Sequence, residues 1–139
     1  IHNNRGGRTV SLMYIDLDRF KEVNDTYGHK VGDAVLVHTA DVLRRLFRDD
    51  FVARLGGDEF LVVRLGKCSM DQMEQEAEAF LKEMRTAFLA AEQTVSLSAS
   101  VGIAQSSDSM VDIDALLQRS DQALYQAKKA GRSRYCVYR

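Results

Sequence analysis

The stretch that decides the fold is FVARLGGDEFLVVRL, residues 51–65, in which two apolar runs flank the pair Gly56-Gly57. Glycine adopts positive φ angles without steric cost, so this pattern is typical of a β-hairpin with a tight turn. The adjacent acids Asp58 and Glu59 follow the turn at once and precede an apolar run. A turn explains the glycines but not the position of these acids. We therefore predict a hairpin that carries two carboxylates at its tip.

A second pair of acids lies upstream, where the apolar and β-branched residues 9–17 predict a buried strand. Asp18 can cap a following helix, whereas Asp16 either lies at an exposed strand end or binds a hard cation such as Mg²⁺, which prefers carboxylate oxygens. If the hairpin lies beside this strand, Asp16, Asp58 and Glu59 converge, and such carboxylates repel one another unless a cation lies between them. Two divalent ions about 4 Å apart would suit phosphoryl or nucleotidyl transfer.

The rest of the chain alternates between helical and strand patterns. The capping box at Ser69 opens one helix, and Gly28 and Gly131 end two others. The expected helices are residues 18–27, 30–47, 70–88 and 113–130, and the expected strands are 9–17, 51–55, 59–65, 95–104 and 135–138. The order β-α-α-β-β-α-β-α-β predicts an α+β domain with a mixed sheet on which helices pack.

The composition predicts one globular domain. The 139 residues are 45% apolar and 28% charged, and the net charge of −1 argues against duplex nucleic acid or an anionic membrane as partner. No apolar stretch is long enough to span a bilayer, no signal peptide is present, and Cys68 and Cys136 lack metal-site spacing, so a cytoplasmic setting is expected. Residues 1–8 are expected to be a linker remnant of a longer protein, and residues 9–139 the domain.

Two further clusters admit a structural or a ligand-binding interpretation. Asn24 and Asp33 fit a turn between helices, but a carboxylate can also accept hydrogen bonds from the N1–H and 2-amino groups of guanine together, a pair that adenine lacks. Lys128 and Arg132 complement a helix dipole at its C-terminus, but they could equally clamp a polyphosphate.

Five motifs together suggest a family. They are Asp16-Leu17-Asp18-Arg19-Phe20-Lys21, Asn24-Asp25, Gly28-His29 to Gly32-Asp33, Arg54-Leu55-Gly56-Gly57-Asp58-Glu59-Phe60, and Ala127-Lys128 to Gly131-Arg132. In order and spacing they resemble the GGDEF family of bacterial diguanylate cyclases over nearly all of the chain after residue 8. The resemblance implies a nucleotidyl-cyclase fold, similar to the polymerase palm, with a mainly antiparallel five-stranded sheet.

The activity that the resemblance implies is the joining of two GTP molecules into cyclic di-GMP with release of two pyrophosphates. Each 3′-hydroxyl attacks the α-phosphorus of the other nucleotide, so an active unit needs two domains face to face. Asp16, the Leu17 carbonyl, Asp58 and Glu59 would hold Mg²⁺ or Mn²⁺. Asp58, or a metal-bound water near it, would take the hydroxyl proton.

The resemblance also implies how the nucleotide is held. Gly56 and Gly57 would let the backbone approach the α-phosphate. The residues expected around the outer phosphates are Arg19, Phe20, Lys21, Lys128 and Arg132, of which Arg19 and Phe20 act through their backbone amides. The residues expected around the guanine and ribose are Asn24, His29 and Asp33.

Two alternatives and one departure remain. The chain could be a GTP-binding regulatory module without turnover, in a composite protein that also carries a phosphodiesterase domain, whereas Asp33 disfavours an adenylate-cyclase-like enzyme.

Many family members have an inhibitory Arg-x-x-Asp site. Here Asp50 is retained but Phe47 occupies the arginine position, and Arg48 is one residue off, which on a helix turns a side chain by about 100°. We therefore expect no inhibitory site.

Overall fold

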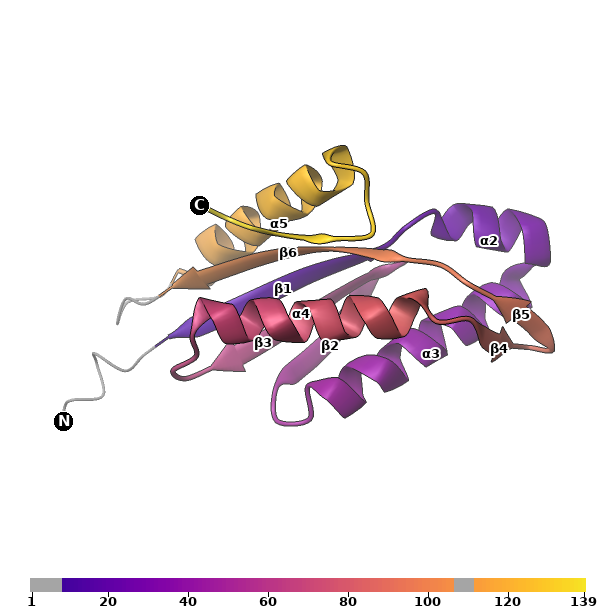
Figure 1. The fold of residues 1–139 in the computed structure, drawn as a ribbon, viewed down its shortest axis with the longest axis horizontal. Helices are drawn as coiled ribbons and strands as arrows, with labels where there is room; N and C mark the ends of the chain where they lie inside the picture. The colour runs from indigo at the N-terminus through magenta and orange to yellow at the C-terminus, as the bar shows by residue number, and fades with distance from the viewer. Residues whose placement is uncertain (1–8, 107–111) are drawn as a thin grey trace.

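A computed structural model describes residues 9–106 and 112–139 of the chain (Figure 1). The expected linker remnant, residues 1–8, lies outside the described residues. The helices are α2 (Phe20–Tyr27), α3 (His29–Leu46), α4 (Met70–Arg85) and α5 (Ile113–Lys129). The strands are β1 (Val10–Leu17), β2 (Phe51–Gly56), β3 (Glu59–Leu65), β4 (Phe88–Ala90), β5 (Gln93–Val95), β6 (Ala99–Ser106) and β7 (Tyr135–Val137).

The main sheet has five strands in the order β2-β3-β1-β6-β7. Its β1–β3, β1–β6 and β2–β3 pairs are antiparallel, and β6–β7 is parallel, which confirms the predicted mixed and mainly antiparallel sheet. The central strand β1 is buried along nearly its whole length, so its sequence is mostly apolar rather than alternating, with Ser11 and Asp16 as buried polar exceptions.

Helices cover both faces of this sheet, with α3 and α4 on one side and α5 on the other (Figure 1). Successive side chains of β1 point to opposite faces. Met13, Ile15 and Leu17 therefore join the larger core under α3 and α4, while Val10 and Leu12 pack against α5. The site residue Asp16 belongs to the α5 face by the same alternation.

The contact between α5 and β6 depends on a glycine. A Cβ atom at Gly102 would lie 2.1 Å from the carbonyl oxygen of Ser120 and 2.3 Å from the amide nitrogen of Leu124. Both are backbone atoms of α5, so no side-chain rotation could relieve the overlap. The bare backbone at Gly102 thus lets α5 lie directly on the sheet.

The predicted strand 95–104 is wrong in part. The chain instead forms the separate two-stranded hairpin β4–β5, and β6 begins only at Ala99. The helix expected to reach Phe88 ends at Arg85, and Phe88 lies on β4. The hairpin turn uses Ala91 and Glu92 at φ 48° and 73°. These residues rarely adopt such angles, so the sequence contains no turn signal here.

The expected helix cap at Asp18 is also wrong. Helix α2 begins at Phe20, and the capping position is Arg19, whose side chain makes no capping hydrogen bond. Asp18 is buried instead, where hydroxyl groups of Ser98 and Ser100 donate to its carboxylate. A buried acid needs such donors, and they come from the start of β6 and the residue before it, about 80 residues later in the chain. The other predicted cap is confirmed, since Ser69 accepts a hydrogen bond from the Gln72 amide at 3.1 Å.

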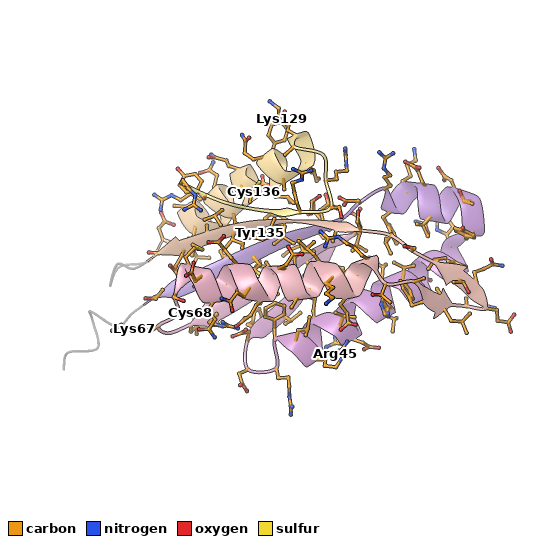
Figure 2. All side chains as sticks on the ribbon, viewed as in Figure 1. Arg45, Lys67, Cys68, Lys129, Tyr135 and Cys136 are labelled. Carbon is orange, nitrogen blue, oxygen red and sulfur yellow. The ribbon has the colours of Figure 1, made fainter. Side chains whose placement is uncertain are left out.

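Two further observations concern the two cysteines and the apolar length of the helices. Cys68 and Cys136 are both free thiols, and Figure 2 shows them well apart, beside α4 and on β7. No helix among the described residues is long and apolar enough to cross a membrane.

Candidate active site

The three predicted metal-binding acids meet where β1 ends beside the β2–β3 turn. In the register of β1 and β3, Asp16 lies directly opposite Glu59. The Leu17 amide donates to the carbonyl oxygen of Asp58 at 3.1 Å, which holds the turn against the end of β1. The convergence that the sequence predicted for Asp16, Asp58 and Glu59 is therefore present in the backbone pairing.

Asp58 and Asp16 are close enough to perturb each other. Burial, the charge of the Asp16 carboxylate and a hydrogen bond with it raise the pKa of Asp58 from 3.8 to about 6. Each effect disfavours a second negative charge at this point. A divalent cation would relieve the repulsion, so this pair has donor chemistry that fits Mg²⁺ or Mn²⁺.

Lys128 supplies the positive charge next to the pair. Its ammonium group, on the last turn of α5, forms an ion pair with Asp16, whose side chain is only 11% exposed. The sequence interpretation placed Lys128 on phosphate groups. In this structure it neutralises Asp16 instead.

Glu59 has a partner that the sequence reasoning missed. The hydroxyl group of Tyr14 donates a hydrogen bond to Glu59 Oε1 at 3.0 Å. Burial and this carboxylate raise the pKa of Tyr14 to about 12. Tyr14 lies two residues before Asp16 and so on the same face of β1, which is the signal that could have identified it.

The acids do not form a closed metal site. Within residues 9–106 and 112–139, no three His, Cys, Asp or Glu side chains are grouped as metal ligands. Asp16 and Asp58 form a pair, and Glu59 is engaged by Tyr14. A cavity of about 460 Å³ opens beside them, lined by Glu59 and Lys128 together with Asp121 and Tyr125 of α5.

The turn between β2 and β3 has the backbone that the sequence predicts. Gly56 and Gly57 adopt φ angles of +147° and +52°, and a Cβ atom on either would meet nothing within 4 Å. Arg54 donates from Nε to the Gly57 carbonyl at 2.9 Å, which stabilises the turn. The backbone of both glycines is thus open to a close-fitting ligand.

Three of the residues expected to bind the outer phosphates, Arg19, Phe20 and Lys21, lie at the start of α2, just beyond the end of β1 (Figure 1). Phe20 is half-buried and packs against the core, whereas Arg19 and Lys21 are exposed. The first amides of a helix lack partners within the helix, so this turn has the electrostatics of an anion site.

The predicted guanine-binding residues come from two helices joined at Gly28. Asn24 is half-buried on α2, while His29 and Asp33 are exposed on the first turns of α3. The Asn24 side chain lies against Gly32, the residue that precedes Asp33. The structure therefore brings Asn24 to the first turns of α3, against the residue before Asp33, and it places His29 at the start of the same helix.

Arg132 lies in the short loop between α5 and β7. Its amide donates to the Ala127 carbonyl at 3.0 Å, and the next amide, of Ser133, donates to Asp18 Oδ2 at 3.0 Å. Asp18 thus anchors the loop that carries Arg132 to the start of α2. This role was not visible in the sequence, because Asp18 and Ser133 are 115 residues apart.

The inhibitory position is occupied by internal contacts. Phe47 is buried in the core, and the Asp50 carboxylate accepts from Arg64 at 2.6 and 3.0 Å. Arg64 also donates to Glu76 at 2.6 Å, and these hydrogen bonds raise the pKa of Arg64. Asp50 is therefore already paired with a partner that the sequence reasoning did not identify.

The fold and the site define an α+β domain with an acidic pair at the end of its central strand and helix-borne polar residues around it. The family model described as "Diguanylate cyclase, GGDEF domain" matches residues 1–134. The chain belongs to the GGDEF domain family.

Named relatives differ in their activities. The chain is 39% identical over 137 residues to the cyclic di-GMP phosphodiesterase PdeR of Escherichia coli K12, covering 98% of this chain and 21% of PdeR. It is 38% identical over 136 residues to the diguanylate cyclase DosC of the same strain, covering 96% of this chain and 29% of DosC. The chain thus spans less than a third of the length of either relative.

A solved structure agrees with the fold. The active GGEEF domain of a diguanylate cyclase from Vibrio cholerae superposes with a TM-score of 0.86 at 34% identity, covering 95% of this chain and 84% of that one. The predicted family and fold are therefore confirmed.

Proposed function

We propose that this chain is the catalytic domain of a diguanylate cyclase, a nucleotidyltransferase that condenses two GTP molecules into cyclic di-GMP and two pyrophosphates. The observation that carries the proposal is the crowded carboxylate pair Asp16 and Asp58 at the end of β1, beside an open glycine turn. The relative DosC, named a diguanylate cyclase, supports it.

In the proposed site, Asp16 and Asp58 would hold Mg²⁺ or Mn²⁺, and the Leu17 carbonyl and Glu59 would complete the ligand set. When bound, the cation neutralises charge on the α-phosphate and favours ionisation of the attacking 3′-hydroxyl. Asp58 is our candidate acceptor of the hydroxyl proton. A bond forms between the 3′-oxygen and the α-phosphorus, the bond from that phosphorus to the bridging oxygen breaks, and pyrophosphate leaves.

The remaining residues position the nucleotide, which is the main requirement of phosphoryl transfer. The outer phosphates are bound by the amides of Arg19 and Phe20 and by the side chains of Lys21, Lys128 and Arg132. Lys128, which pairs with Asp16 in this structure, would be available for this role in a site whose acids hold a cation. The guanine and ribose are held by Asn24, His29 and Asp33.

One domain supplies one GTP and therefore half of the reaction. We propose that turnover requires a homodimer in which two sites face each other across a two-fold axis. Further domains of a longer chain would control this pairing, in the cytoplasm or on the cytoplasmic side of a membrane.

The test is GTP turnover with Mg²⁺, followed by chromatography of cyclic di-GMP over a series of protein concentrations. A rate that rises with the square of concentration indicates transient dimers. The variant Asp58→Ala should lose at least about 100-fold in turnover without unfolding. The matched control Asp49→Ala removes an exposed acid and should turn over normally. GTP binding without any product, including at high protein concentration, would contradict the proposal.

A second function is a GTP-binding regulatory module without turnover. The Lys128–Asp16 ion pair favours it, because a module that never binds a cation needs this charge compensation. The relative PdeR, named a phosphodiesterase, is consistent with such a module in a composite protein. Calorimetric GTP binding in the absence of product would select this alternative.

A further inference from the structure

We propose that Gly32 is a positioning residue for nucleotide specificity, because its missing side chain makes the space in which the Asn24 carboxamide lies, one residue before Asp33. The inference rests on the proposed function, since it takes a guanine nucleotide as the ligand. Gly32 is buried and has no side chain that could contact a base, so it would act through Asn24.

The evidence is steric. A Cβ atom built on Gly32 would lie 1.8 Å from Asn24 Oδ1 and 2.9 Å from Asn24 Cγ. It would also lie 3.4 Å from Cζ of Phe20. The first two distances are far shorter than contacts between real atoms, so the Asn24 carboxamide fills the place that any other residue at position 32 would need.

The backbone does not explain this glycine. Gly32 lies inside α3 and is absent from the residues with positive φ angles, so an alanine could adopt its conformation. Glycine inside a helix lowers stability relative to alanine. Gly28, by contrast, has a φ of +94° and open space around it, as expected for a glycine that makes a turn. The close approach of Asn24 is the feature that accounts for Gly32.

The backbone around this contact is well defined. The Gly28 amide donates to the Asn24 carbonyl at 2.8 Å, and the Gly32 amide donates to the Gly28 carbonyl at 3.1 Å. These two bonds fix α2 against the first turn of α3. The Asn24 carboxamide then lies against Gly32, the residue before Asp33. Asn24 offers donors and an acceptor, and Asp33 offers acceptors only.

A methyl group at position 32 should change nucleotide recognition without damaging the fold. It meets the far end of a flexible side chain rather than backbone, so Asn24 rotates away and the helices keep their positions. The alanine also improves helix propensity. Gly32→Ala should therefore leave the midpoint of thermal unfolding unchanged or raise it, while nucleotide binding is weakened and discriminates less. Simple damage to the fold would lower both the midpoint of thermal unfolding and the affinity for the nucleotide.

The experiment compares Gly32→Ala, Asn24→Ala and the double variant in the 139-residue chain. Calorimetry with GTP, inosine triphosphate and ATP measures recognition without depending on turnover. We expect Gly32→Ala to bind GTP about 10- to 100-fold more weakly and to discriminate less between GTP and the other two nucleotides. In the Asn24→Ala background, Gly32→Ala should cause no further loss, because the carboxamide is already absent. The control Val37→Ala, at an exposed position of α3, should bind as the unaltered chain does.

Two outcomes overturn the inference. Gly32→Ala could bind GTP as tightly as the unaltered chain, or it could weaken binding equally with and without Asn24. Failure of the unaltered chain to bind GTP would overturn the proposed function instead. In that case the Asn24 side-chain amide signals in nitrogen-edited NMR still test the contact, since they should shift in Gly32→Ala and stay unchanged in Val37→Ala.

Discussion

The hydroxyl group of Tyr14 donates a 3.0 Å hydrogen bond to Glu59 Oε1 across the β1–β3 pair. Glu59 is directly opposite Asp16 in that pair, and Tyr14 lies two residues before Asp16 on the same strand. The bond therefore ties the third acid of the site to the strand that carries the first. It orients a carboxylate that would otherwise rotate freely beside an already crowded pair.

Replacing Tyr14 by phenylalanine tests this orientation. Tyr14→Phe keeps the ring but removes the donor, so Glu59 loses its fixed position. We expect apparent Mn²⁺ affinity, measured by electron paramagnetic resonance without nucleotide, to fall about tenfold, as is usual when a ligand's hydrogen-bond partner is lost. The control Tyr138→Phe alters an exposed tyrosine and should leave Mn²⁺ binding unchanged. Equal Mn²⁺ binding by the two variants would show that Tyr14 does not orient Glu59.

The position of these acids could be predicted from the sequence, but their partners could not. The glycine turn and the two apolar runs fix the hairpin, and the apolar run before Asp16 identifies the neighbouring strand. Register then brings Asp16 opposite Glu59. Which hydroxyl or ammonium group approaches each carboxylate depends on side-chain packing from distant elements, as with Lys128 on α5. Local pattern contains no information about such contacts.

Asp18 should be essential for stability. Its buried carboxylate accepts from the Ser100 hydroxyl at 2.7 Å, from the Ser133 amide at 3.0 Å and from the Ser98 hydroxyl. Asp18→Ala leaves three donors without their acceptor, so we expect the free energy of unfolding in urea to fall by about 3 kcal/mol. Asp41→Ala, which removes an exposed acid, should change it by less than about 0.5 kcal/mol. A comparable small effect for Asp18→Ala would contradict the assignment.

Gly102 should tolerate no larger side chain. In Gly102→Ala the new methyl group meets backbone atoms of Ser120 and Leu124, so α5 must move off the sheet. We expect a loss of about 2–3 kcal/mol in the free energy of unfolding. Gly66→Ala is the matched control, because Gly66 has a φ of +104° and a Cβ atom built there would meet no atom of the described residues within 4 Å. It incurs backbone strain alone, about 1 kcal/mol. Equal losses in the two variants would mean that strain, not overlap, sets the effect at Gly102.

The segment between α4 and β6 shows where prediction from the sequence fails. Alternation of apolar and small residues from Val95 to Ala104 favours one continuous strand. The Asp18 amide instead donates to the Ser98 carbonyl at 2.9 Å, which bends the chain toward the site before β6 begins. The preceding hairpin turns at Ala91 and Glu92 without glycine. Tertiary contacts thus override a pattern that is locally consistent with a strand.

Cyclic di-GMP should not inhibit this domain through the position of Asp50. The Asp50 carboxylate is paired with Arg64, and Phe47 is buried where a ligand-binding arginine would be needed. Initial rates of GTP turnover with added cyclic di-GMP should therefore be unchanged, apart from competition at the substrate site. Non-competitive inhibition that disappears in Asp50→Ala would contradict this expectation.

His38 makes stability depend on pH. Its ring stacks on Phe88 of β4 with 3.6 Å between ring centroids. Its Nε2 atom is buried and has no hydrogen-bond partner among residues 9–106 and 112–139. Burial lowers the pKa of His38 below 6.5, as does Arg45, while Glu83 and Asp41 act in the opposite direction. Arg45, labelled in Figure 2, forms an ion pair with Glu83 at 2.8 Å. Because its positive charge offsets the negative charge of Glu83, the carboxylate attracts a protonated His38 less strongly.

The sign of the effect follows from this lowered pKa. Between the folded pKa and 6.5, the unfolded chain binds a proton at His38 that the folded chain does not, so acid favours unfolding. The stabilising contribution is complete above pH 6.5 and is lost as the pH falls through the folded pKa. Urea unfolding from about pH 8 to about pH 5 should show a steeper loss of stability for the unaltered chain than for His38→Phe, which cannot titrate and keeps the stack on Phe88. Parallel curves for the two proteins would show that His38 is protonated equally in the folded and unfolded states.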